Sequence, residues 1–599
     1  LDKLDNIEDR PFETLYASRL RTLSKSKHSN LTNVGFNPRE MVVEKPSPWD
    51  ISNLSASYGV TKTERSDPFI SKEETRETNV ALDYAYNRGS AAYIEPLKGL
   101  KSKYLRLFKE FNFNPLPNSF GVTNQLTRTF AETNYRFAEV EPRFNRYFNK
   151  RFIWNRNYDL LWNFTRSLRL NYNASMYATI DEPDEALIQA NLDIADPDQY
   201  RRDSIWTNIR NFGRPKQFTQ NFNASYTLPL RYLPFLDFVD VRANYLGSYT
   251  WTAAPLNAEF LGNTIQNSQS RQVTADLNFE RFYDQFKFLR NINRPQRPGG
   301  SRPTAPARPP RGKDAEEVTE ESTDGKAARR KAASAGPSNA TRALVRPLLA
   351  IRRARFNFSE TFETVVPGYL PQPELLGLSN GFQDPGLGFI VGLQPTIREL
   401  TDQDRMLANA GNPSSRDWLA QNNGFLTTSA FQNNNVVQNY TRNWDGTLTI
   451  EPLQDFRIEV NMKRSFTENY TETYKVLDKP DPNNPSAGLS FTHAVPTYNG
   501  ALSMTYGGLS GLFNTDTASL AALFSQFEAN RVVISQRLGD GRPHANPDFA
   551  EQGYAFGYGP AQQEVLLPAF LAAYRGEDAA TSTLDPFSLK PSPKLAFDL

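Results

Sequence analysis

The sequence of 599 residues contains no cysteine, which excludes disulfide bonds, thiolate zinc sites and a cysteine nucleophile. Histidine is almost as rare, and His28, His493 and His544 lie far apart in the chain. No serine or threonine stands in the strand–turn–helix context of a hydrolase nucleophile, so a Ser–His–Asp triad has little support. We therefore expect a protein that is not an enzyme, with no catalytic residue, no cofactor and no bound metal.

Long apolar runs and an excess of one charge are also missing. The longest apolar stretch, residues 565–574, contains Pro568 and falls short of the roughly 18 residues that a membrane helix needs. The 68 basic and 66 acidic side chains leave a formal charge of +2, which is no electrostatic footprint for nucleic acid. A β-barrel membrane protein stays compatible with this composition, because only every second residue of its strands faces lipid.

What the sequence does contain is strand-like alternation, clearest in residues 226–251. From Val239 onward, apolar side chains alternate with polar ones, and Leu246 is the one exception. Pro229 and Pro234 cannot donate ladder hydrogen bonds, so we expect them in the reversal between two strands. The apolar face comprises Val239, Val241, Ala243, Tyr245, Gly247, Tyr249 and Trp251. Aromatics at the strand ends are typical of the interfacial girdle of a membrane barrel.

Similar alternation recurs along the chain and predicts about a dozen strands. A second hairpin is expected around Glu451-Pro452-Leu453, and the run from Leu168 to Ile180 alternates almost perfectly. We expect residues 281–291 to coil into a short helix, and Leu520–Phe527 show helical spacing with Asp516 or Thr517 as the cap. The sequence therefore predicts an all-β protein.

The domain organisation follows from these signals. We expect an irregular entry segment at 1–48, strands and loops at 49–291 and 344–507, and a loop and helical cap region with its following segment at 508–599. Residues 292–343 are low in complexity and rich in Pro, Arg and Ala, so they form a disordered linker. No signal peptide and no terminal strand signal are visible, which predicts a piece of a longer polypeptide.

Reversal signatures rich in Pro and Leu recur at residues 94–97, 114–117, 228–230 and 450–453. Short reversals alternate with long loops, which is the pattern of an outer-membrane barrel with short periplasmic turns and long extracellular loops. Counting strands from Tyr226 predicts that residues 284–345 lie on the side of the Pro–Leu turns and residues 367–426 on the opposite side. We expect the long loops to cap the mouth of the barrel and gate it.

Two loops raise the question of a ligand. In the acidic loop 181–213, carboxylates could hold Ca²⁺, although their spacing is not that of an EF-hand and a solvated loop is the favoured interpretation. These carboxylates are Asp181, Glu182, Asp184, Glu185, Asp193, Asp196 and Asp198. Gly386-Leu387-Gly388 with Gly392 lacks the Lys-Ser/Thr of a phosphate-binding loop, so we interpret it as a turn-rich loop.

The residues also resemble a known family. The stretches YTLPLRYLPFLDFVDVRANYLGSYTW, NRNYDLLWNFTRSLRLNYNASMYATIDEP, VPGYLPQPELLGLSNGFQDPGLGFIVGLQP and GYGPAQQEVLLPAFLAAYRG are similar to the SprA/Sov family of the Bacteroidetes. The similarity is spread over about residues 50–590 and rests on scattered aromatic, Pro and Gly signatures. The chain departs from the family in lacking its long N-terminal portion, in its ending and in the composition of residues 292–343.

The resemblance implies the outer-membrane translocon of the type IX secretion system, a very large single-chain transmembrane barrel that also supports gliding motility. Its partners would be secreted cargo proteins with a C-terminal signal domain, an accessory outer-membrane barrel (PorV-like), a plug protein and outer-membrane lipid. The chain would then be part of such a barrel in the bacterial outer membrane, with no nucleic-acid partner. The alternatives are a TonB-type or porin-like uptake barrel and a secreted all-β adhesin.

Overall fold

A computed structural model gives the architecture of the chain. It describes residues 23–35, 47–293, 345 and 349–598, with gaps inside these ranges at 68, 90–91, 100–105, 136–145, 185–187, 189–195, 234, 375, 380–382, 395–417, 454–455, 477–490, 506–516, 540 and 585–593. The predicted disordered linker falls almost entirely on residues 294–344, outside the described part.

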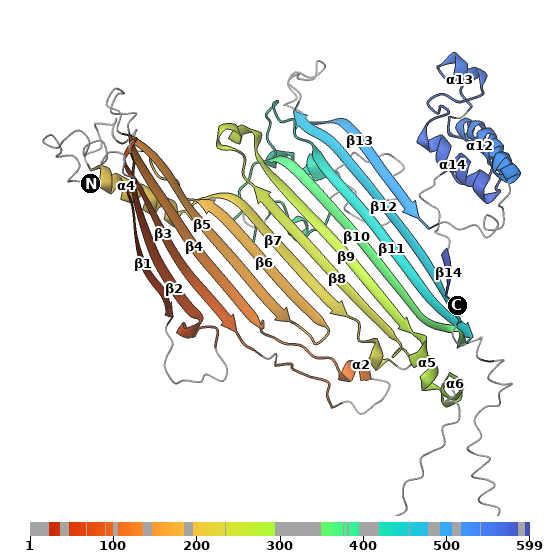
Figure 1. Cartoon of the computed structure of the whole chain (residues 1–599), viewed down its shortest axis with the longest axis horizontal. Coiled ribbons are helices and arrows are strands. Elements are labelled where there is room, and N and C mark those ends of the chain that lie inside the picture. Colours follow the sequence, from red (N-terminus) through yellow and green to blue (C-terminus); the bar gives the residue numbers. More distant parts are fainter. Residues whose placement is uncertain are drawn as a thin grey trace, which may run out of the picture.

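The fold is one antiparallel sheet of 14 strands in which chain neighbours are sheet neighbours from β1 to β13 (Figure 1). The all-β prediction is therefore confirmed, and the sheet is open between its edges. The strands are β1 (Leu23–Gly35), β2 (Leu54–Ser66), β3 (Ile70–Asn87), β4 (Ser119–Tyr135), β5 (Arg146–Asn163), β6 (Leu168–Thr179), β7 (Arg214–Thr227), β8 (Val239–Thr252), β9 (Asn263–Asn278), β10 (Ile351–Tyr369), β11 (Val436–Leu453), β12 (Phe456–Val476), β13 (Phe491–Met504) and β14 (Lys594–Asp598).

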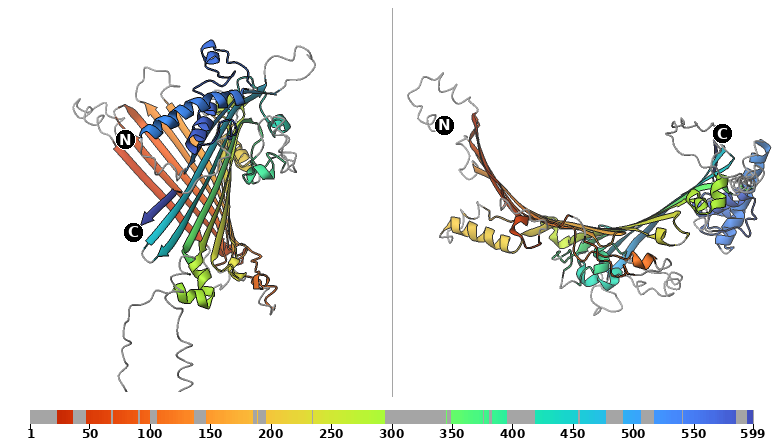
Figure 2. Two further views of the ribbon diagram at one scale, coloured as in Figure 1. Left: turned by 90° about the vertical axis from the view of Figure 1, so that its right-hand side faces the viewer. Right: turned by 90° about the horizontal axis from the view of Figure 1, so that it is seen from below.

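The sheet is curved, with a concave face toward the viewer of Figure 1 and a convex face behind it (Figure 2). The short helices α9 (Leu387–Ile390) and α11 (Trp418–Gln421) lie on the convex side, as does the longer helix α4 (Pro197–Arg210). One layer of strands therefore presents two very different surfaces.

The predicted β7–β8 hairpin is confirmed. Phe222 pairs with Gly247, and Ala224 pairs with Tyr245, so the apolar rows of the two strands share one face. Pro229 lies in the reversal, directly before the 3₁₀ turn Leu230–Tyr232. The second predicted hairpin, β11–β12, turns between Leu453 and Phe456.

Connections gather at two edges. At the lower edge in Figure 1 the chain passes from β3 to β4, β5 to β6, β7 to β8, β9 to β10 and β11 to β12, and at the upper edge it passes from β2 to β3, β4 to β5, β6 to β7, β8 to β9, β10 to β11 and β12 to β13. The Pro–Leu reversals, the end of β9 before the predicted linker and the start of β10 after it thus share the lower edge, and the described part of residues 370–426 belongs to the upper edge, as expected. The expected separation of short turns at one edge from long loops at the other is only partial, because the long connection 88–118 lies at the lower edge.

Further short helices lie in these connections. The lower edge has η1 (Ile51–Asn53), α2 (Arg106–Lys109), α5 (Phe279–Gln285) and α6 (Lys287–Asn293), and the upper edge has η3 (Leu256–Leu261) and η5 (Asn423–Phe425). Helices α5 and α6 confirm the helical prediction for residues 281–291. Tyr283, Ile292 and Leu349 form a small core there.

Three expectations were wrong. Residues 23–35, placed in the irregular entry segment, form β1, which pairs with β2 along its length. The acidic loop contains helix α4, which begins because the Asp196 side chain accepts from the backbone N–H groups of Asp198 and Gln199 and because Pro197 fits the first turn. The chain end forms strand β14, although five residues are too few for a clear alternation signal.

Strand β14 reveals an interrupted strand at one edge of the sheet. Strand β13 pairs with β12 down to Met504 opposite Arg464, and the Thr505 N–H then donates to the Lys463 carbonyl. Strand β14 resumes the pairing at Lys594 opposite Asn461. Only Met462 of β12 lies between the two contacts, so β13 and β14 together occupy a single strand position.

The excursion between β13 and β14 contains a helical unit. It consists of α12 (Thr517–Leu538), α13 (Pro547–Glu551) and α14 (Gln563–Arg575), and α12 confirms the helix predicted over Leu520–Phe527. The unit has its own core of Ile534, Ala569 and Ala579, against which Phe527 packs. The predicted helical cap region is therefore an insertion into the last strand position.

Candidate functional site

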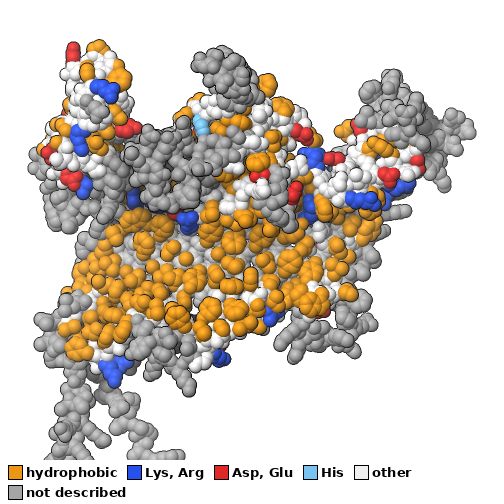
Figure 3. Space-filling view, turned by 180° about the vertical axis from the view of Figure 1, so that it is seen from behind, with side chains coloured by type: hydrophobic (Ala, Val, Ile, Leu, Met, Phe, Trp, Pro, Cys, Tyr) orange, Lys and Arg blue, Asp and Glu red, His pale blue; other side chains and the backbone are white. Residues whose placement is uncertain are grey.

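The convex face carries a continuous apolar belt below the connections of the upper edge (Figure 3). Strand pairing aligns apolar side chains in rows; Ala243, Val273 and Phe358, for example, are opposite one another on β8, β9 and β10. The belt comprises Val80, Leu82, Tyr84, Phe120, Val122, Leu126, Leu160, Leu168, Leu170, Phe222, Ala224, Val239, Val241, Ala243, Val273, Ala275, Leu277, Phe356, Phe358, Trp444, Leu448, Val460 and Met462.

Several side chains of this belt are exposed although they are large and apolar. Leu82, Val80 and Phe356 keep 45%, 37% and 41% of their surface accessible. Soluble monomers rarely expose contiguous apolar patches beyond a few hundred Å². The belt is therefore a surface built to contact an apolar medium or partner.

A row of charged groups ends the belt toward the upper edge. Glu360 of β10 is buried to 8% exposure and accepts hydrogen bonds from the Tyr440 hydroxyl at 2.7 Å and from the Arg442 guanidinium at 3.0 Å. On its other side, Arg271 of β9 lies 3.9 Å from the same carboxylate. Three adjacent strands thus place paired charges at one height, which marks a boundary between apolar and polar surroundings.

Above this boundary the connection 370–435, as far as it is described, lies against the convex face, and we call it the docked loop. The Tyr245 hydroxyl donates to the Val391 carbonyl at 2.7 Å, and the Gln220 amide donates to the Ile390 carbonyl at 3.1 Å. Tyr249 and Trp251, from the apolar row of β8, are fully buried beneath it. The described part of the docked loop thus lies on the convex side of the sheet, and the expectation that the long loops gate the mouth stays a prediction.

Glycines make this close docking possible. A Cβ on Gly247 would stand 1.9 Å from the Val391 carbonyl oxygen, and one on Gly392 would stand 2.4 Å from the Ser268 carbonyl oxygen. Gly392 also has φ +94°, which few other residues adopt. The motif Gly386-Leu387-Gly388 with Gly392 is thus a turn-rich loop around α9, as predicted, whose glycines serve contact between backbones.

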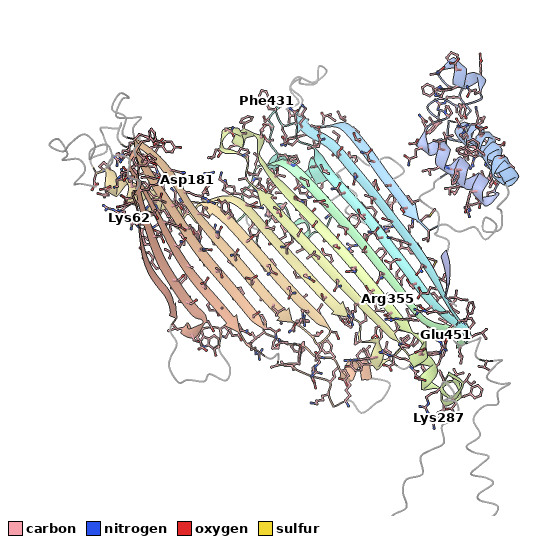
Figure 4. The ribbon with its side chains drawn as sticks, in the orientation of Figure 1. Lys62, Asp181, Lys287, Arg355, Phe431 and Glu451 are labelled. Atoms are coloured by element: carbon pink, nitrogen blue, oxygen red, sulfur yellow. The ribbon has the colours of Figure 1, made fainter. Side chains whose placement is uncertain are left out.

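Figure 4 views the concave face, whose central strands carry mostly polar side chains, with Leu246 of β8 as an exception. Some of its carboxylates accept from amides; Asp445 accepts from the Asn357 amide at 2.8 Å and Asp159 from the Asn173 amide at 2.6 Å. Uncharged polar groups dominate the central strands: Asn171, Asn173, Ser175, Thr219, Asn221, Asn223, Ser225, Asn244, Ser248, Thr250, Gln266, Ser268, Ser270, Gln272, Asn357, Ser359, Thr361, Thr441 and Asn443. Such a surface stays hydrated and offers little apolar area for adhesion.

Arginines concentrate at the lower end of the concave face. A hollow of about 460 Å³ is lined there by Arg242, Arg281, Arg353 and Arg355, whose charges exceed those of Asp240 and Asp276. The sequence reasoning missed this group, because its members come from β8, β9, α5 and β10. The alternation Arg353-Ala354-Arg355 at the start of β10 was the one local signal.

The candidate calcium ligands are mostly used in ion pairs and in a cap. Asp181 accepts two hydrogen bonds from Arg214 at 2.7 Å, which lower the pKa of its carboxyl group, and Glu182 accepts from Arg128 at 2.6 Å. Asp196 caps α4, and Asp198 pairs with Arg201 at 2.5 Å. Asp184 stands before the first gap, and Glu185 and Asp193 lie outside the described residues.

The histidines also remain apart. His493 Nδ1 lies 2.8 Å from the fully buried carboxylate of Glu472, which also accepts from the Tyr470 hydroxyl. His544 packs its ring against Phe549 in the helical unit, and His28 belongs to β1. Within the described residues there is no group of three or more His, Asp or Glu side chains suited to a metal ion.

Comparisons with known proteins add no relative. No protein-family model matches the chain, and no curated protein shows significant similarity to it. Among the helices that the structure describes, none combines the length and the apolar character needed to cross a membrane.

Proposed function

We propose that this chain forms part of the wall of a very large outer-membrane β-barrel that conducts folded proteins, as the SprA/Sov translocon of type IX secretion does. The observation that carries the proposal is the two-faced curved sheet, with an apolar convex belt and a polar concave face. In a barrel the convex face meets lipid and the concave face lines the lumen.

Strand length and pairing support this assignment. From β2 to β13 the strands run from 12 to 21 residues, whereas about 9–11 residues suffice to cross the hydrocarbon core. Continuous antiparallel pairing satisfies the backbone of each central strand on both sides. That satisfaction is required in lipid, because each unpaired amide costs several kcal/mol there.

The curvature supports a wide lumen. Thirteen consecutive strands curve in one direction without bringing β1 near β13 (Figure 2). Because barrel diameter grows with strand number, a sheet this shallow belongs to a barrel of many more strands. A lumen of that width suits folded cargo better than the small solutes of a porin-like uptake barrel.

The mechanism would be physical and not catalytic. Hydrated Asn, Ser, Thr and Gln side chains on the concave face would let a folded cargo surface pass without apolar adhesion. Cargo with a C-terminal signal domain, an accessory barrel, a plug protein and outer-membrane lipid would be the partners. The lower edge would face the periplasm, and the upper edge, with the docked loop, would face the cell surface.

The test compares two deletions in the bacterium that carries the chain. Removing the β7–β8 hairpin, residues 214–252, would break the wall and abolish surface appearance of cargo that carries the C-terminal signal. Removing residues 300–335, which lie outside the described sheet, is the matched control and would leave secretion intact. Retained secretion with lost solute uptake in the hairpin deletion would instead support an uptake barrel.

Sidedness has its own test. A protease site inserted at residue 320 would be cleaved only after the outer membrane is permeabilised, because both flanks of that segment emerge at the lower edge. Cleavage on intact cells would reverse the proposed orientation.

A further inference from the structure

The arginine hollow differs from the rest of the concave face in its charge. Its four guanidinium groups face two carboxylates, and above it the central strands carry mainly uncharged polar side chains. Arg353, Arg355 and Arg281 keep 52%, 50% and 58% of their side chains exposed. The groups are therefore accessible from the concave side.

The ion pairs inside the hollow leave donors unused. Arg353 and Arg355 share the single carboxylate of Asp276, which lies 3.2 Å from Arg355. Arg281 reaches Asp240 at 3.4 Å, and both of these side chains are largely exposed. Arg242, two residues from Asp240 on the same face of β8, also lines the hollow and makes no ion pair within the described part of the chain. The hollow thus holds two positive charges in excess, and the guanidinium group of Arg242 carries no ion pair there.

Guanidinium groups of this kind recognise carboxylates, because their parallel N–H groups match the two carboxylate oxygens. We propose that the hollow binds the carboxylates of an acidic peptide segment, presented by cargo as it enters the lumen from the lower edge. This inference rests on the proposed function for the identity of the cargo, but the binding chemistry depends only on the hollow.

Position argues against a lipid headgroup as the ligand. The hollow opens on the concave face, whereas the apolar belt lies on the convex face of the same strands. An acyl chain in contact with the belt cannot deliver its headgroup to the opposite side of a paired sheet. A peptide in the lumen reaches the hollow directly. The positive charge of the hollow would attract an acidic segment and so favour entry of cargo at the lower edge of the sheet.

The experiment measures binding of a fluorescein-labelled 12-residue peptide of alternating Asp and Glu to the full chain in detergent micelles. The double variant R242Q/R355Q should weaken binding at least fivefold. The control K463Q/K475Q removes the same charge from the same face of β12 and should change binding less than twofold. A 12-residue Ser/Asn peptide should not bind to any of the three proteins.

Salt gives a second readout that a structural role would not produce. Raising ionic strength from 0.05 to 0.5 M should weaken binding to the unmodified chain and have little effect on R242Q/R355Q. The proposal would be overturned if R242Q/R355Q and K463Q/K475Q bound the acidic peptide equally well, or if the Ser/Asn peptide bound as tightly as the acidic one. Failure of the chain to insert into vesicles would refute the proposed function while leaving this binding result to decide the inference.

Discussion

Replacing Val273 by arginine tests whether the convex belt meets lipid. Val273 lies in the middle of β9, with Ala243 and Phe358 directly opposite on the two neighbouring strands. An arginine there would bring its charge into the apolar belt, far from the charged row that ends it. On a lipid-facing barrel strand near the bilayer midplane, arginine costs about 2–4 kcal/mol.

The matched control is the adjacent residue. Gln272 points to the concave face and lies opposite Asn244 and Ser359. Gln272→Arg should therefore cost less than about 1 kcal/mol, the usual range for an exposed polar site. The two variants differ by one position in the chain and by the face that receives the charge.

The assay is reversible unfolding in urea of the chain inserted in phosphatidylcholine vesicles, followed by tryptophan fluorescence. A loss of about 2–4 kcal/mol for Val273→Arg corresponds to a roughly 30- to 800-fold fall in the folding equilibrium constant. Equal losses for the two variants, or a larger loss for Gln272→Arg, would refute the assignment of the belt to lipid.

Three further predictions concern the docked loop, the register and pH. Gly247→Ala should expose the docked loop to proteolysis, because the new Cβ would stand 1.9 Å from the Val391 carbonyl oxygen. In the control Gly446→Ala the new Cβ would meet no atom nearer than 3.7 Å, so the loop should stay protected. In this cysteine-free chain, paired cysteines at Ser248 and Ser268, whose hydroxyl oxygens lie 2.6 Å apart, should form a disulfide on mild oxidation; failure would place β8 and β9 in another register. Arg214 lowers the pKa of the Asp181 carboxyl group by hydrogen bonding to its charged form. The ion pair therefore stabilises α4 and its connection at any pH above the ordinary Asp pKa. This stabilisation is lost as the pH falls through the lowered pKa. Because the pair is half exposed, the loss should stay below about 1 kcal/mol, and proteolysis of α4 that does not rise in acid would contradict it.

Much of the sheet was predictable because each strand carries its own period-two pattern. The rows of β6, β7, β8 and β12 alternate so regularly that strand pairing only had to align them. The reversals were equally visible, since Pro229 and Pro452 cannot serve as donors within a central ladder.

What the sequence hid depends on contacts between distant segments. Strand β1 was missed because Ser, Lys and Asn dominate residues 23–35, and only pairing with β2 makes them a strand. Helix α4 was missed because its apolar residues form no continuous stripe and no residue of it is buried. Strand β14 has five residues and depends on β12 for its conformation.

The faces themselves were predicted, but their partners were not. Tyr249 and Trp251 were expected in an aromatic girdle, and the structure buries both under the docked loop. The arginine hollow draws its members from four elements, so no window of sequence contains it. Such sites emerge only when register places β8, β9 and β10 side by side.

Site-directed spin labelling along β8 tests the central claim most directly. Single cysteines at residues 239–246 of the vesicle-inserted chain would each carry a nitroxide, and relaxation by oxygen and by a water-soluble nickel chelate would be compared at each position. The account predicts that Val239, Val241 and Ala243 respond mainly to oxygen in the lipid and that Asp240, Arg242 and Asn244 respond mainly to nickel in water. A response that does not alternate between the two sets, or one in which the sets exchange roles, would contradict a wall with lipid on its convex face and water on its concave face.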